Sequence, residues 1–237
     1  MRFLFQCVLF CFVATNSIVE GDELDESNIS LNGDPLFVSL GADCLTAGMI
    51  QHFGKRQSAF PFDWLVTLDG MQLIHVLNND FQDFVNKDYL VRHPIEGKRL
   101  VHRGYHMEFT HDWNDDYWLS HTQYDEGIEK LQIKYQRRIT RFKQLANSKC
   151  KVVFIRLLLP VFPIPELYWF DYPPQKNERE YSLDLYRALQ NLFPHLDFKL
   201  VVVCKADSYR REVIDDITLY YFSDVREHSN WAPLFNE

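Results

Sequence analysis

The chain has 237 residues, a formal net charge of −8 and no long run of lysine and arginine. Such a chain lacks the basic surface with which proteins bind nucleic acids or anionic lipids, so both kinds of partner are excluded. With 46% hydrophobic and 15% aromatic residues, it is long enough to bury one sizeable core and too short for two ordinary domains.

Residues 1–19 are predicted to be a signal peptide. Met1 and Arg2 precede an apolar run from Phe3 to Val13, and small and polar residues follow. This run is shorter than the ~20 residues that a membrane span requires. The mature protein is therefore expected to be secreted or to reside in the lumen of the endoplasmic reticulum or Golgi, with no membrane partner after cleavage.

Residues 20–35 are predicted to be a flexible acidic arm, because they are polar and lack apolar periodicity. They contain the sequence Asn28-Ile29-Ser30, which is an acceptor pattern for N-glycosylation and suits a lumenal glycoprotein. Residues 36–237 are expected to form a single α/β domain.

The domain is predicted to begin with a strand, a tight turn and a helix. The apolar run 36–40 ends at Gly41, and apolar residues then continue with helical spacing over 45–53. This order places Asp43 near the N-terminus of the helix and Cys44 in its first turn.

The remaining elements follow from the spacing of apolar residues. Apolar residues that recur every three or four positions predict helices at 71–84, 124–145 and 181–192. Continuous apolar runs predict buried strands at 151–159, 199–204 and 217–222, and residues 90–109 fit short strands or an extended loop. Strands buried on both faces and separated by helices indicate a largely parallel sheet with helices on both sides.

The segment Ser39-Leu40-Gly41-Ala42-Asp43-Cys44 is the strongest chemical signal in the sequence. It places a thiol directly after a strand and a glycine turn, at a helix N-terminus. Unpaired N–H groups and the helix dipole favour a thiolate there and can hold an oxyanion. Cys44 is therefore the candidate nucleophile, and a small structural cysteine at the strand–helix junction is the alternative.

His111, in Phe109-Thr110-His111-Asp112-Trp113, is the first candidate for the base. An imidazole can accept the cysteine proton and later protonate the leaving group. His102 and His106 are alternatives on the same stretch.

Asp63 is held between large apolar side chains in the segment 59–64. A carboxylate in that setting is expected to orient the catalytic histidine or stiffen the Cys44 pocket, or else to cap the turn or pair with an arginine. Asp112 remains open as the third catalytic residue, and Asp224 with His228 could form a different acid–base pair. The common metal, P-loop and dinucleotide motifs are absent, so no metal and no cofactor are predicted.

Five cysteines are present, of which Cys7 and Cys11 fall in the predicted signal peptide. If the strands next to Cys150 and Cys204 are parallel neighbours, these two cysteines lie at opposite ends of them. They are then farther apart than the ~7 Å that a disulfide allows between Cα atoms. Three free thiols are predicted, with Cys44 the reactive one.

The motifs resemble those of a known family. Ser39-Leu40-Gly41 followed by Cys44, then Pro61-Phe62-Asp63-Trp64, then Phe109 with His111-Asp112 are similar to a family of domains of unknown function described as papain-like cysteine peptidases. The resemblance implies a nucleophile at Cys44 and a histidine at His111. It also implies a papain-like α+β fold as the alternative to the parallel sheet.

Two functions are carried forward. The first is a hydrolase or transferase of the cysteine peptidase type in the secretory pathway, in which Cys44 attacks a peptide, acyl or glycan-linked substrate and His111 is the base. The alternative is a non-catalytic or glycan-processing lumenal domain, in which Cys44 is structural and the segment 160–174 forms a sugar-binding platform. The aromatic residues of that platform are Tyr168, Trp169, Phe170 and Tyr172.

Overall fold

The computed structural model describes residues 34–67, 70–93, 99–113, 115–159 and 177–235. The predicted signal peptide, the arm up to residue 33 with its glycosylation sequence, and the aromatic segment 160–174 lie outside these residues. Within the described ranges, no helix combines the length and the apolar character that crossing a membrane requires.

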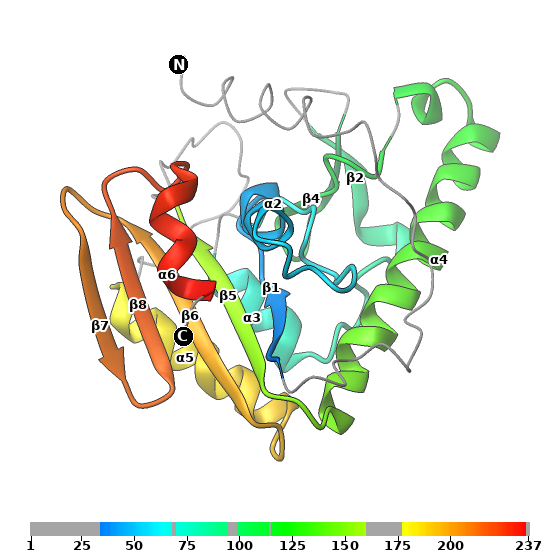
Figure 1. Ribbon diagram of the computed structural model, residues 1–237. Coiled ribbons are helices and arrows are strands. Elements are labelled where there is room, and N and C mark those ends of the chain that lie inside the picture. The colour runs from blue at the N-terminus through cyan, green and yellow to red at the C-terminus, as the bar shows by residue number, and fades with distance from the viewer. Residues whose placement is uncertain (1–33, 68–69, 94–98, 114, 160–176, 236–237) are drawn as a thin grey trace.

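A five-stranded sheet forms the centre of the domain, with its strands in the order β1-β5-β6-β8-β7 (Figure 1). The strands are β1 (Leu36–Ser39), β5 (Val152–Leu158), β6 (Phe198–Lys205), β7 (Arg210–Ile214) and β8 (Ile217–Phe222). Four of them are parallel, and β7 alone runs antiparallel, at the edge beside β8. The predicted mostly parallel α/β sheet is confirmed, whereas the α+β alternative is not what the strands form.

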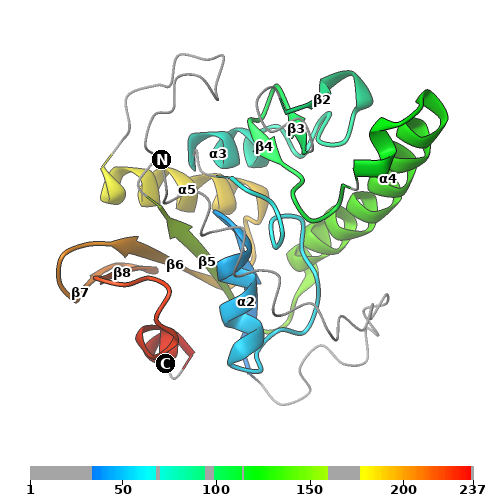
Figure 2. The same cartoon turned by 90° about the horizontal axis from the view of Figure 1, so that it is seen from above.

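Helices cover both faces of this sheet (Figure 2). One face carries α2 (Cys44–His52) and α6 (Ala232–Phe235), and the other carries α3 (Gly70–Asn78), α4 (His121–Gln144) and α5 (Glu178–Leu192). Neighbouring strand residues supply different cores, since Phe154 packs under α4 and α5 while Ile155 packs under α2 and α6. Burial on both faces explains why these strands are continuous apolar runs in the sequence.

A smaller antiparallel sheet occupies the stretch for which short strands or a loop were expected. It contains β2 (Leu90–Arg92), β3 (Leu100–His102) and β4 (Met107–Glu108). Val66 connects it to the main sheet, because Val66 pairs in parallel with Ala42 and antiparallel with Glu108. Val66 thus lies between the chain that leads to His111 and the turn that precedes Cys44.

The helix predicted over residues 71–84 is shorter in the structure, because α3 ends at Asn78. Asp80, Phe81 and Asp83 have φ angles of 50°, 62° and 58°, and a right-handed helix cannot continue through such a backbone. Phe81 and Phe84 are nevertheless buried. Turns therefore place these apolar residues in the core, and the periodicity alone could not distinguish them from a further helical turn.

Cys150 and Cys204 are both free, as predicted. Cys204 pairs with Leu158 at the end of β5, whereas Cys150 precedes the start of that strand. Cys44 is disulfide-bonded, so the prediction of three free thiols is wrong for this residue, and neither Cys150 nor Cys204 is its partner. Cys44 is half-buried, and an accessible thiol at a helix N-terminus is readily oxidised.

Cys204 is expected to resist alkylation in the folded protein. Burial raises the pKa of its thiol to about 12, and only 1% of the residue is exposed, so thiolate and access are both lacking. Iodoacetamide at about pH 8 should modify the half-buried Cys150 first, with Cys204 reacting only after denaturant is added. Mass spectrometry that found both thiols modified at the same rate in the native protein would contradict this.

Candidate functional site

The turn between β1 and α2 is strained. Gly41 and Ala42 have φ angles of 73° and 142°, and non-glycine residues such as Ala42 rarely adopt a positive φ. A Cβ atom at Gly41 would lie 2.8 Å from the carbonyl oxygen of Phe62, so the close approach of the two segments requires glycine. Backbone strain of this kind concentrates at functional sites.

Helix α2 begins at Cys44, directly after this turn. Asp43 is its N-cap, and Oδ1 of Asp43 accepts a hydrogen bond from the Leu45 N–H at 2.8 Å. The first N–H groups of a helix have no partner within the helix, and the helix dipole is positive at this end. A thiolate or an oxyanion at Cys44 is therefore electrostatically favoured.

Arg156 of β5 holds the turn from inside the domain, where it is fully buried. Its guanidinium donates hydrogen bonds to the Leu40 carbonyl oxygen at 2.8 Å, to Thr67 Oγ1 at 2.6 Å and to the Thr67 carbonyl oxygen. The Thr67 N–H in turn donates to the carbonyl oxygen of Ala42 at 2.7 Å. Arg156 thereby joins β5, the strained turn and residue 67 into one network.

His111 lies just beyond β4, with its ring packed edge-on against Trp64 at 5.8 Å between ring centroids. The residue is exposed at the surface, so part of the imidazole can be reached by a substrate. Trp64 itself belongs to the aromatic segment 59–64, and the guanidinium of Arg56 lies over its ring at 5.5 Å from the centroid.

Four charged residues act on the imidazole of His111. Desolvation by the packed surroundings lowers its pKa below the usual value, Arg99 and Lys134 add to this effect, and Asp112 and Asp43 oppose it. A histidine with a lowered pKa is neutral near pH 7 and can accept a proton. Asp43, the residue that precedes Cys44, is thus one of the charges that raise the pKa of His111.

The carboxylate of Asp63 binds an arginine and a backbone N–H of its own segment. Its Oδ2 accepts hydrogen bonds from Arg56 Nη2 and from the Phe60 N–H, both at 3.0 Å. Burial raises the pKa of this carboxyl, and Arg56 opposes that effect. Asp63 therefore caps a turn and pairs with an arginine, which is the structural role weighed for it in the sequence.

Asp112 binds helix α4. Its carboxylate lies 2.8 Å from Lys134 Nζ and 4.0 Å from Arg138 Nη1, and it accepts a hydrogen bond from the Tyr135 hydroxyl at 2.6 Å. Burial alone would raise the pKa of Asp112, but Arg138 and Lys134 outweigh it and hold the pKa below its usual value. These contacts anchor Asp112 to α4 and thereby restrict the position of the neighbouring residue His111.

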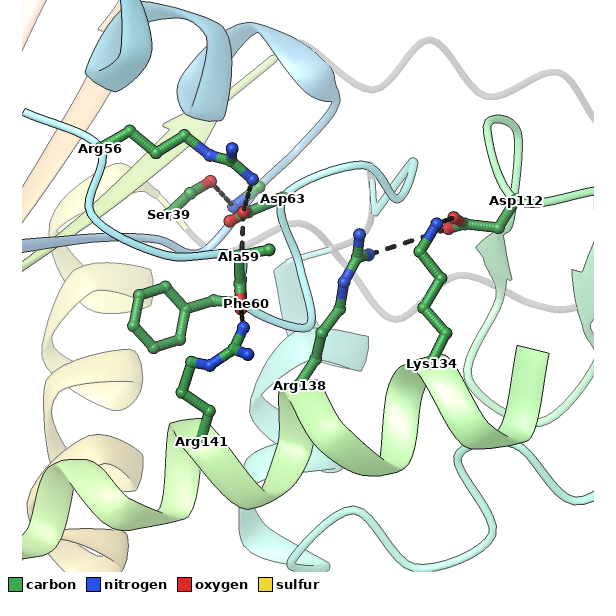
Figure 3. A network of polar contacts seen from close by, with 10 residues as sticks. Ser39, Arg56, Ala59, Phe60, Asp63, Asp112, Lys134, Arg138 and Arg141 are labelled. Carbon is green, nitrogen blue, oxygen red and sulfur yellow. Dashed lines mark hydrogen bonds and ion pairs between the residues drawn. The ribbon is translucent and has the colours of Figure 1, made fainter. Parts of the chain in front are cut away.

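One face of α4 binds both motif segments (Figure 3). Lys134 and Arg138 point toward Asp112, and Arg141 donates to the Ala59 carbonyl oxygen at 2.6 Å. Arg138 also lies close enough to Asp63 to lower its pKa. The three cations therefore hold the segments around Asp63 and Asp112 on a common support.

Residues 35–207 match the family named "Putative papain-like cysteine peptidase". The chain belongs to this family. The matched residues include Cys44, Asp63 and His111, and also Arg156.

A similar protein is "Uncharacterized protein R408" of Acanthamoeba polyphaga mimivirus, which is 30% identical over 147 residues. The match covers 53% of this chain and 63% of the viral protein, so less than two thirds of that relative is spanned. No solved structure matches the chain.

His102 and His106, the alternative candidates for the base, lie in and next to the strands of the small sheet. His102 is buried, its Nε2 lies 3.0 Å from the Asp83 carbonyl oxygen, and its Nδ1 accepts the Tyr105 N–H at 2.8 Å. Both ring nitrogens thus have protein partners, and burial lowers the pKa of the ring. His106 lies in the turn between β3 and β4 with a φ of 50°.

His228, of the alternative pair Asp224 and His228, lies at the C-terminal end of α2 and not at the end that begins with Cys44. The ring of His228 packs on that of His52, the last residue of α2, at 4.2 Å between centroids. A helix rises 1.5 Å per residue, so His52 lies about 12 Å from Cys44 along the axis. Asp224 caps a turn by accepting the Arg226 N–H at 2.9 Å.

Arg156 is the site residue that the sequence analysis did not assign. The signal was a single arginine inside the otherwise apolar run 152–159, because a charge in a strand buried on both faces requires partners. Among the residues that the structure describes, no group of three or more His, Cys, Asp or Glu side chains could hold a metal ion.

Proposed function

We propose that this protein is a cysteine peptidase or a related thiol hydrolase or transferase, with Cys44 as the nucleophile and His111 as the general base. The observation that carries the proposal is the placement of Cys44 as the first residue of α2, directly after a turn in which Ala42 has a φ of 142°. This position places the thiol at the positive end of a helix. The backbone of the preceding turn is fixed by the hydrogen bond from Arg156 to the Leu40 carbonyl oxygen.

The reaction would proceed through an acyl-enzyme. His111 accepts the proton of Cys44, the sulfur attacks the carbonyl carbon of the substrate, and N–H groups of the first turn of α2 stabilise the oxyanion. The protonated imidazole then gives its proton to the leaving amine or alcohol. Water, or another acceptor in a transferase, attacks the resulting thioester and regenerates the thiol.

The reaction requires reduced Cys44. The disulfide recorded at this residue has no thiol proton to transfer, so a reducing thiol must first cleave it by exchange. We further propose that the protein acts in the secretory pathway on a peptide, acyl or glycan-linked substrate. The apolar segment near its N-terminus supports that location.

Alkylation of the reduced protein tests the nucleophile. Iodoacetamide at about pH 6 should modify Cys44 faster than it modifies glutathione, because only a thiol with a lowered pKa is ionised there. Turnover of p-nitrophenyl acetate and of a fluorogenic peptide library should fall at least about 1,000-fold in Cys44→Ala and about 100-fold or more in His111→Ala.

Cys150→Ala is the matched control, since it removes a free cysteine remote from the turn, and it should leave both measurements unchanged. The proposal fails if Cys44 reacts no faster than glutathione and Cys44→Ser retains the turnover of the unmodified protein.

A further inference from the structure

Asp112 and Asp43 both raise the pKa of His111, and Asp63 precedes Trp64, whose ring packs on that of His111. Asp63 and Asp112 are committed to other partners. Asp63 is bound by Arg56 and by the Phe60 N–H. Asp112 is bound by cations and a hydroxyl of α4. Neither arrangement leaves the carboxylate directed mainly at the imidazole.

The remaining carboxylate is Asp43, which the strand pairing brings toward His111 through Val66. Asp43 follows Ala42, Ala42 is bridged through Val66 to Glu108, and His111 comes three residues after Glu108. The N-cap contact with the Leu45 N–H uses only Oδ1 of Asp43. The cap therefore fixes this carboxylate while its second oxygen takes no part in the helix.

We propose that Asp43 is the positioning residue of His111, holding the imidazole beside Cys44 and stabilising the imidazolium that forms when the thiol proton is transferred. This inference rests on the proposed function. It gives one residue two tasks, since Asp43 caps the helix that presents the thiol and orients the base that activates it.

The charges that face this pair come from several elements. His111 is faced by Arg99 before β3, by Lys134 of α4, by its neighbour Asp112 and by Asp43. Burial raises the pKa of Asp43, whereas the Leu45 N–H, Arg226, Arg156 and His111 lower it. Arg99 and Lys134 have the carboxylate partners Glu108 and Asp112. Asp43 adds a second negative charge to that of Asp112, which has the larger effect on the pKa of His111.

Asp43→Asn separates the two tasks. Asparagine caps a helix as well as aspartate does, so α2 and the fold should persist while the negative charge is lost. The pKa of His111, followed by NMR of its ring C–H groups in the reduced protein, should fall by at least about 0.5 unit, because an opposite charge near a histidine raises its pKa. The turnover number should fall about 10-fold or more with little change in KM.

Asp43→Glu should recover part of the turnover, whereas Asp43→Ala should lose the cap and also unfold more easily. Asp63→Asn is the matched control, since it removes the other motif carboxylate without moving the pKa of His111 by a comparable amount. An unchanged His111 pKa in folded Asp43→Asn would overturn the inference. If that pKa shifts while Cys44 shows no enhanced reactivity, the coupling stands and the proposed function fails.

Discussion

Replacement of Arg156 by methionine is expected to lower the free energy of unfolding by about 3–5 kcal/mol and to slow alkylation of reduced Cys44. Methionine fills much of the space but leaves the carbonyl oxygens of Leu40 and Thr67 buried without their donor. A buried acceptor that loses its partner costs about 1–3 kcal/mol. The strained turn at Ala42 would then be free to relax, which moves the thiol away from the positive end of the helix.

Urea denaturation measures the first effect, and the rate of iodoacetamide modification measures the second. Arg156→Lys should be intermediate, because lysine keeps the charge without the planar fork of donors. Arg179→Met is the control, since that arginine is 63% exposed and its loss should change little. A variant Arg156→Met that unfolded at the wild-type urea concentration would show that the network does not hold the turn.

Asp112→Ala is expected to destabilise the protein by about 3–5 kcal/mol near pH 7, because it leaves the buried Arg138 without its carboxylate partner. The pKa of Asp112 is lowered in the folded state. Its stabilising contribution is therefore fully present above the unfolded value, which is about 3.9, and is lost as the pH falls through the folded value. The difference between wild type and variant should shrink in acid.

Urea midpoints at about pH 7 and about pH 3 test this dependence. Glu126→Ala provides a matched control, since its ion pair with Lys130 is at the surface and the side chain is 55% exposed. It should cost little at either pH. An Asp112→Ala variant with the same deficit at both pH values would show that the ion pairs do not stabilise the fold.

The elements with clear apolar patterns could be predicted from the sequence, and those set by other forces could not. Strands buried on both faces and the long amphipathic α4 leave distinct patterns of apolar residues. Strand β7 was missed because it is an edge strand with mostly charged and exposed residues, which resembles a loop in sequence.

At the site, local sequence located Cys44 because a strand, a glycine turn and a helix are consecutive. The partners of Asp63 and Asp112 depend on tertiary contacts, and no local pattern encodes them. The basic residues of α4 illustrate this, because charged residues between the apolar positions of an amphipathic helix usually face solvent. Lys134, Arg138 and Arg141 instead turn inward to bind the two motif segments.

The pairing of β1 with β5 has a consequence for the order in which the site can form. Arg156 contacts the Leu40 carbonyl oxygen across 116 residues of sequence, and β1 has its only full strand partner within the described residues in β5. Contacts of such long range form late, because the intervening loop must first be closed. During synthesis the segment with Cys44 therefore emerges long before the strand that holds it, and a truncated chain that ends before residue 152 should lack an organised turn.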